Sequence, residues 1–149
     1  MPFVRPARTF AQTLDEIAKR LARYGDVEAA DEGTGIRRRD LSFVVTAPGY
    51  GMPVVATFEF RERYRRMAAG WLREAYVFEY RPLSPKSRRA HHEHGTWGIH
   101  QHCEPPGKSS DEHYQDVERL LEPTAEELGG LYDRGEQIRC LGLRRKLHR

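Results

Sequence analysis

This sequence has few cysteines, no long apolar run and little net charge. Cys103 and Cys140 are its only cysteines, which excludes a disulfide-rich scaffold and leaves room for one bridge. No apolar run approaches the roughly 20 residues of a membrane-spanning helix, so we expect no association with a membrane. The N-terminal residues lack the apolar core of a secretory signal peptide, and we therefore expect a cytoplasmic protein.

What the chain does contain is the composition of a globular domain. Hydrophobic residues make up 38% and charged residues 32%, a balance that allows a buried core and a polar surface. The length of 149 residues predicts a single domain that spans residues 1–149.

The net charge of +3 conceals an uneven distribution along the chain. Residues 61–89 carry nine basic and three acidic side chains, a net charge of +6, whereas residues 104–136 carry three basic and ten acidic ones, a net charge of −7. The basic stretch lies directly upstream of a group of histidines, where a positive field favours an anionic ligand such as nucleic acid. Alternatively, the arginines solvate exposed strand faces and pair with the acidic segment.

The N-terminal region has the spacing of an amphipathic helix. Apolar residues recur at helical intervals between Phe10 and Tyr24, Thr9 is a suitable N-cap, and Gly25 supplies a stop. The acidic, glycine-containing residues 26–35 that follow are expected to form a loop.

The C-terminal region predicts one or two further helices. The first would begin at Ser109 or Ser110 and end at Leu121, before a proline. The second would begin at Thr124 and end near Tyr132. The pattern of the basic tail is compatible with either a helix or a strand.

Between these helical regions the apolar residues alternate with polar ones, which is typical of strands. Turn-forming residues separate the strands, and short connections favour an antiparallel meander. The expected strands are residues 41–46, 54–63, 71–81 and 96–102. Together with the helices they predict an α+β fold with an N-terminal helix, an antiparallel sheet of about four strands and one or two C-terminal helices.

Histidines are concentrated in one short part of the sequence. Five of the seven fall within residues 91–102: His91, His92, His94, His100 and His102. In the expected last strand, His100 and His102 lie on the same face. The remaining two, His113 and His148, are expected at the surface.

One hypothesis for this cluster is acid–base cleavage of RNA. Imidazole titrates near neutral pH, so one histidine can take a proton from a ribose 2′-hydroxyl while another protonates the leaving oxygen. This chemistry needs no metal and no other cofactor. The candidate catalytic residues are His91, His92, His100 and His102.

The same hypothesis assigns substrate contacts to residues near the histidines. Arg81, Arg88 and Arg89 would stabilise the charge that develops on the phosphate. Tyr80 would stack on an exposed base.

Two alternatives stay open. In one, a His-x-His pair on a strand binds zinc, iron or copper, with His92, His94 or Glu104 as a further ligand. In the other, the basic strand face and loop bind nucleic acid or an acidic protein without catalysis.

The histidine region resembles the TumE-like toxin family of prokaryotic toxin–antitoxin systems over roughly residues 39–103. The matching features are an aromatic strand at 77–81, the pair His91 and His92, and a Thr-aromatic-x-x-His-x-His segment at 96–102. The family's Asp-Asn turn is replaced by Arg-Pro-Leu, and a basic insertion follows. The resemblance implies an RNA-cleaving toxin with a cognate antitoxin as partner. A homodimer is a further expectation.

Overall fold

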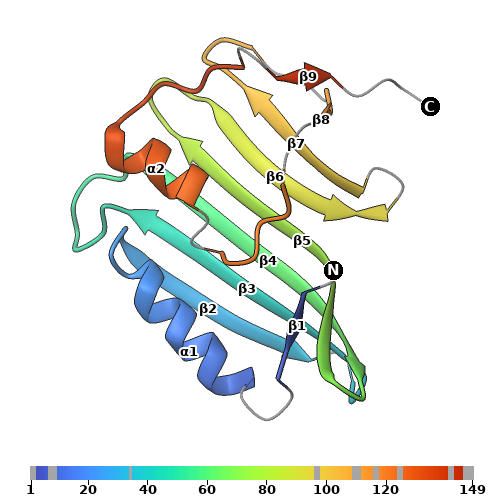
Figure 1. Cartoon of the computed structure of the whole chain (residues 1–149). Coiled ribbons are helices and arrows are strands. Elements are labelled where there is room, and N and C mark those ends of the chain that lie inside the picture. Colours follow the sequence, from blue (N-terminus) through green and yellow to red (C-terminus); the bar gives the residue numbers. More distant parts are fainter. Residues whose placement is uncertain are drawn as a thin grey trace.

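The computed structural model of the chain describes residues 3–6, 10–33, 35–95, 98–108, 112–115, 118–123, 126–140 and 143–145. Within them, one antiparallel sheet of nine strands forms the body of the protein (Figure 1). Strands β2 to β9 follow one another in sequence order, and β1 pairs with β5 beside this path. The strands are β1 (Val4–Arg5), β2 (Asp26–Gly33), β3 (Arg38–Ala47), β4 (Ala56–Met67), β5 (Gly70–Pro82), β6 (Arg88–His94), β7 (Gly98–Glu104), β8 (Tyr114–Gln115) and β9 (Arg144–Arg145).

The two described helices, α1 (Phe10–Leu21) and α2 (Glu126–Arg134), pack on the same face of this sheet (Figure 1). Their buried side chains include Ile17, Leu21 and Leu128. The sheet contributes alternate residues of its long strands to the same core: Leu41, Phe43, Val45, Phe58, Phe60, Phe78 and Tyr80. Each strand of this region therefore has one apolar face toward the helices and one polar face away from them. Neither described helix has both the length and the apolar character needed to cross a bilayer.

The apolar face of the sheet ends in a buried cluster of charged residues. Glu62 accepts hydrogen bonds from Arg73 at 2.9 Å and from Tyr64 at 2.8 Å, and Arg5 of β1 approaches it at 3.4 Å. The side chains of Glu62 and Arg73 are almost completely buried. Because Arg5 belongs to β1, this cluster helps to hold the N-terminal strand against β5.

The predicted α+β fold class is wrong, because the protein is mostly β. Its two described helices contain only 12 and 9 residues, whereas strands β2 to β7 contain between 7 and 13 residues each. Three errors of assignment contribute to the difference: a loop expected at residues 26–35, a helix expected between residues 109 and 121, and a strand at residues 88–94 that was not expected.

The first error is the expected loop at residues 26–35. Residues 26–33 form β2 and pair with β3 along their full length, from Asp26 opposite Thr46 to Gly33 opposite Arg39. This strand lies at the edge of the sheet, where main-chain pairing can stabilise it although most of its side chains are exposed. Because the segment is acidic and mostly exposed, its sequence has no alternating apolar pattern from which a strand could be predicted.

The second error is the expected helix between residues 109 and 121. Tyr114 pairs with Gln101 of β7, and residues 118–121 are not helical. The proposed caps Ser109 and Ser110 lie outside the described residues, as do Thr9, Thr124 and His148. The tail then supplies β9, which pairs with β8.

The third error concerns residues 88–94, which form β6 and pair with β5 and β7 although no strand is expected there.

The other assignments hold. The helix expected from the spacing after Thr9 is α1, and the one expected after Thr124 is α2. The three central strands are β3, β4 and β5, connected as a meander, and the strand expected at 96–102 is β7. The basic loop after β5 is shorter than expected, because its last residues, Arg88 to Ala90, already belong to β6.

Candidate metal centre

Strands β6 and β7 bring histidines together on the sheet face that points away from the two helices. His92 lies directly opposite His100, and Ala90 lies opposite His102. Because side chains that share a strand face are two residues apart, His94 joins the same group. A fifth histidine, His113, precedes β8, the next strand of the sheet. We name these five residues the histidine cluster: His92, His94, His100, His102 and His113.

The five imidazole rings are in direct contact. The ring centroids of His92 and His102 are 4.7 Å apart, and those of His100 and His102 are 5.1 Å apart. His113 lies 4.8 Å from His100 and 4.5 Å from His102 by the same measure. His100 is fully buried, His92 and His102 are each about 8% exposed, and His94 lies at the exposed side of the cluster.

Backbone carbonyls fix the orientation of two of these rings. The Nδ1–H of His100 donates to the carbonyl oxygen of Gly98 at 3.0 Å, and the Nδ1–H of His102 donates to that of Glu112 at 3.0 Å. A carbonyl oxygen can only accept, so each ring keeps its lone pair on Nε2. Within the part of the chain that the structure describes, Nε2 of His100 is buried and has no hydrogen-bond partner. Metal-binding histidines commonly have this arrangement, in which the second nitrogen holds the ring in place.

A carboxylate orients the third ring. His92 Nε2 lies 3.4 Å from Glu79 Oε1, which leaves His92 Nδ1 on the side of the cluster, 3.3 Å from Nε2 of His94. Arg88 and Arg81 also donate to Glu79, at 2.7 and 2.8 Å. Burial alone would raise the pKa of Glu79, but the hydrogen bonds from His92 and Arg88 and the arginine charges lower it well below its ordinary value. Glu79 is therefore a carboxylate at neutral pH.

The imidazoles of His100 and His102 are neutral at physiological pH. Burial, reinforced by the neighbouring histidines, lowers the pKa of His100 to about 3 and that of His102 to about 4. Burial and the proximity of His92 also lower the pKa of His94. Neutral imidazole is the form that binds a metal ion.

Two groups of three histidines have the spacing of a metal site. The candidate ligand atoms of His92, His94 and His100 lie within 4.8 Å of one another, and so do those of His100, His102 and His113. Tetrahedral zinc with Zn–N distances of about 2.0–2.1 Å places its nitrogens about 3.3 Å apart. The 3.3 Å between His92 Nδ1 and His94 Nε2 already has this value. The other rings need to move by only about an ångström to complete either group.

A groove of about 500 Å³ borders the exposed side of the cluster. His94 of β6 lines it together with residues of β2, β3, β4 and β5. Arg61 is 3.0 Å from Glu59, and Arg63 is 3.2 Å from Asp40, so the groove contains paired charges of both signs. A ligand bound at His94 would therefore have a polar surface beside it.

Two of the predicted site residues lie on the opposite face of the sheet. His91 pairs with Phe78 and Arg89 with Tyr80, both core residues. His91 Nε2 is 3.1 Å from Glu127 of α2, and Arg89 donates to the same carboxylate at 2.8 Å and to the carbonyl of Arg139 at 3.1 Å. The expected catalytic set of four histidines is therefore divided by the sheet: His92, His100 and His102 are together, and His91 is not.

The other predicted substrate-binding residues also have different environments. The base-stacking role predicted for Tyr80 does not fit its position, because its ring packs against Phe58 in the core, with the ring centroids 4.8 Å apart, and is not accessible to a base. Arg81 and Arg88 do lie on the face of the histidine cluster, bound to Glu79. Arg88 also approaches Glu104, which removes that carboxylate from the set of obvious ligands. Trp97 lies outside the described residues.

Two members of the histidine cluster, His113 and His94, were not among the catalytic residues expected from the sequence. His113 was assigned to the surface of a helix, whereas it precedes a strand that pairs with β7. His94 falls between the strands expected at 71–81 and 96–102, whereas it ends β6. The signal that could have identified His94 is its spacing of two residues from His92.

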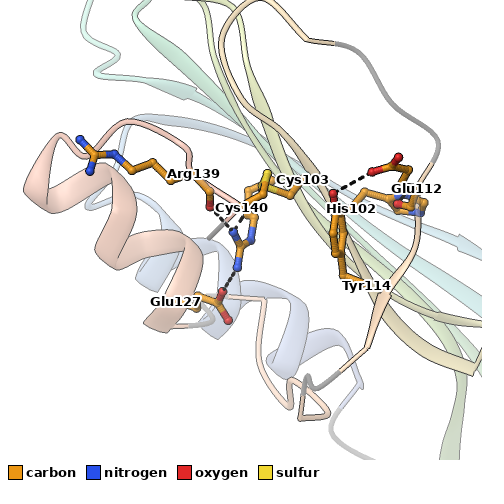
Figure 2. Close-up of a disulfide and its surroundings, with 8 residues drawn as sticks. His102, Cys103, Glu112, Tyr114, Glu127, Arg139 and Cys140 are labelled. Atoms are coloured by element: carbon orange, nitrogen blue, oxygen red, sulfur yellow. Dashed lines mark hydrogen bonds and ion pairs between the residues drawn. A yellow bond between two sulfur atoms is a disulfide. The ribbon is translucent and has the colours of Figure 1, made fainter. Parts of the chain in front are cut away.

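Cys103 and Cys140 form a disulfide on the side of β7 opposite His102 (Figure 2). The bridge joins β7 to the chain that follows α2, next to the contacts of Glu127 and Arg139 (Figure 2). Cys103 therefore faces the core, as strand alternation from His102 predicted, and neither sulfur reaches the histidine cluster.

Comparisons with family models, with curated proteins and with solved structures gave no match to this chain. The resemblance to TumE-like toxins stays a prediction.

Proposed function

We propose that this protein binds a transition-metal ion through the histidine cluster. The observation that supports this most strongly is the convergence of five imidazoles from three neighbouring segments on one sheet face. Isolated buried histidines usually find a hydrogen-bond partner for each polar nitrogen, whereas His100 Nε2 has none among the described residues. A bound ion would satisfy it.

The geometry favours metal binding over the acid–base hypothesis. A general acid or base works best when its pKa lies near the pH of the reaction. The lowered pKa values of His100 and His102 keep both rings neutral, which suits a ligand and weakens a proton donor. In addition, His100 is fully buried and cannot reach a substrate directly.

The donor set indicates which ions the cluster would take. Imidazole nitrogen suits zinc, copper, iron and nickel, whereas magnesium and calcium prefer oxygen ligands. Zn²⁺ is a suitable first probe because it has no redox chemistry and accepts tetrahedral nitrogen sites.

The test is equilibrium binding of Zn²⁺ to the tag-free, chelator-stripped protein, followed by calorimetry and elemental analysis. We expect stoichiometric binding by the wild type and a large loss of affinity in His100→Ala, because His100 belongs to both groups of three histidines. The matched control is His91→Gln, which changes a histidine on the opposite sheet face and should bind normally. Folded wild-type protein that binds no Zn²⁺, Ni²⁺, Cu²⁺ or Fe²⁺ would refute the proposal.

Cleavage of RNA is the second candidate, and one observation favours it. Arg81 and Arg88 lie on the same sheet face as His92, His100 and His102, so a phosphate beside the cluster would meet positive charge. A toxin of this kind would have an antitoxin as partner. Incubation of single-stranded RNA with the protein, with and without EDTA, separates the candidates. Cleavage that persists in EDTA supports the metal-independent hypothesis. Cleavage that requires a metal ion would mean that the protein is a metal-dependent ribonuclease.

The disulfide bears on the expected location. Cytosolic thiols are normally kept reduced, so the Cys103–Cys140 bridge is more typical of an oxidising compartment than of the cytoplasm that the N-terminus predicts. Alkylation of thiols in freshly lysed cells decides between the two, because only a cytoplasmic protein should have both cysteines reactive.

A further inference from the structure

We infer that the histidine cluster holds one ion at a time, at either of two positions that share His100. The outer position has His92, His94 and His100 as ligands, and the inner position has His100, His102 and His113. This inference rests on the proposed function and goes beyond it, since it assigns the number of ions, their ligands and the place where a further ligand binds.

The shared residue limits the cluster to one fully ligated ion. Nδ1–H of His100 is used by the carbonyl of Gly98, so only Nε2 can reach a metal. One nitrogen lone pair binds one ion. An ion at the outer position therefore leaves the inner position with two ligands, and the reverse is also true.

The charge of the cluster has the same consequence. All five ligands are imidazoles, and they offer no negative charge to offset two neighbouring dications. Sites that hold two metals a few ångströms apart usually include carboxylates. The carboxylate of Glu79 contacts His92 and is also bound to Arg88 and Arg81. Two ions at these positions would repel each other strongly.

The two positions differ in their access to solvent. His94 is exposed and lines the groove, so an ion at the outer position has its fourth coordination site toward that groove. At the inner position His100 and His102 are buried and His113 is only partly exposed, so this position is the more enclosed of the two. Catalytic metal sites keep an open position for water or substrate, and closed sites do not. The outer position is therefore the one that would bind water or a small anion.

Substitution of one unshared histidine at a time isolates each position. His113→Ala retains the three ligands of the outer position, and His94→Ala retains those of the inner one. Co²⁺ serves as the probe because its visible spectrum reports coordination, and azide serves as the small anion. We expect one Co²⁺ per chain in the wild type and in both variants. We expect azide to change the Co²⁺ spectrum of the wild type and of His113→Ala, and to leave that of His94→Ala unchanged.

The outcomes separate this inference from the proposed function. Two Co²⁺ per wild-type chain would overturn the inference and leave metal binding intact. A spectral change with azide in His94→Ala as large as that of the wild type would have the same consequence. Absence of Co²⁺ binding by folded wild-type protein would overturn both. Circular dichroism of each variant verifies the fold. His102→Gln replaces His113→Ala if the latter is unfolded, since it also removes a ligand of the inner position alone.

Discussion

His92 of β6 and His100 of β7 are directly opposite each other, with their rings 5.2 Å apart and nearly perpendicular. A polar contact on the side away from the cluster orients each ring: His92 contacts the Glu79 carboxylate, and His100 donates to the Gly98 carbonyl. The nitrogens that remain point into the histidine cluster. The pair is therefore oriented by groups that are not themselves candidate ligands.

Glu79→Gln should weaken metal binding without abolishing it. An amide at this position is a poorer partner for His92 than the carboxylate, and loss of such an orienting group typically lowers metal affinity about 10- to 100-fold. The measurement is a competition titration of Zn²⁺ against a chelator of known affinity. Glu59→Gln, on the same sheet face but paired only with Arg61 in the described contacts, is the matched control and should keep wild-type affinity.

Reduction of the disulfide should lower stability but leave the metal site intact. The bridge joins residues separated by 37 positions, and the chain-entropy treatment of a loop of that length gives about 4 kcal/mol. Because Cys103 points away from His102, Zn²⁺ stoichiometry should not change in Cys140→Ser. Urea denaturation with and without reductant measures the first effect, and elemental analysis measures the second. Loss of bound Zn²⁺ from folded, reduced protein would show that the sulfurs take part.

Strand alternation was enough to predict part of the candidate site. The period of two placed His100 and His102 on one face, and it placed Cys103 on the other. The same rule separates His91 from His92 once residues 88–94 are recognised as a strand. That recognition failed because the segment is basic and histidine-rich and has no apolar period to mark it.

The pairing between distant segments was beyond the reach of local patterns. His113 enters the cluster because Tyr114 pairs with Gln101, a contact set by the whole C-terminal path and not by neighbouring residues. The edge strand β2 was missed for a related reason, since main-chain pairing with β3 stabilises it and its side chains are mostly exposed. The central strands were found because they bury one full apolar face.

Glu62→Ala should be strongly destabilising. It would leave the guanidinium group of Arg73 in the protein interior without its carboxylate and Arg5 with only the partly exposed Glu122, and breaking a buried ion pair from one side typically costs about 3–5 kcal/mol. Asp40→Ala is the control, because its pair with Arg63 is partly exposed and such surface pairs contribute about 0–1 kcal/mol. Urea denaturation of the two variants gives the comparison. Equal losses in both would mean that the Glu62 cluster contributes no more than a surface pair.

Glu127 should make stability depend on pH in the acid range. Its contact with His91, which outweighs the effect of burial, and the charges of His91 and Arg89 lower its pKa from 4.5 to about 2. The folded state therefore favours the carboxylate, and the resulting stability is fully present above pH 4.5. It is lost as the pH falls from about 4.5 to about 2, where the folded protein also takes up the proton.

Glu127→Gln tests this dependence directly. The variant should be less stable than the wild type at pH 6, and the difference should shrink as the pH approaches 2, because the wild-type carboxyl is then also neutral. Thermal unfolding followed at several pH values between 2 and 6 measures it, with Glu126→Gln, its exposed neighbour in α2, as the control. A difference between Glu127→Gln and wild type that stays constant over this range would exclude the carboxylate charge as its cause. The contact between α2 and β6 would then depend on packing and hydrogen bonding alone.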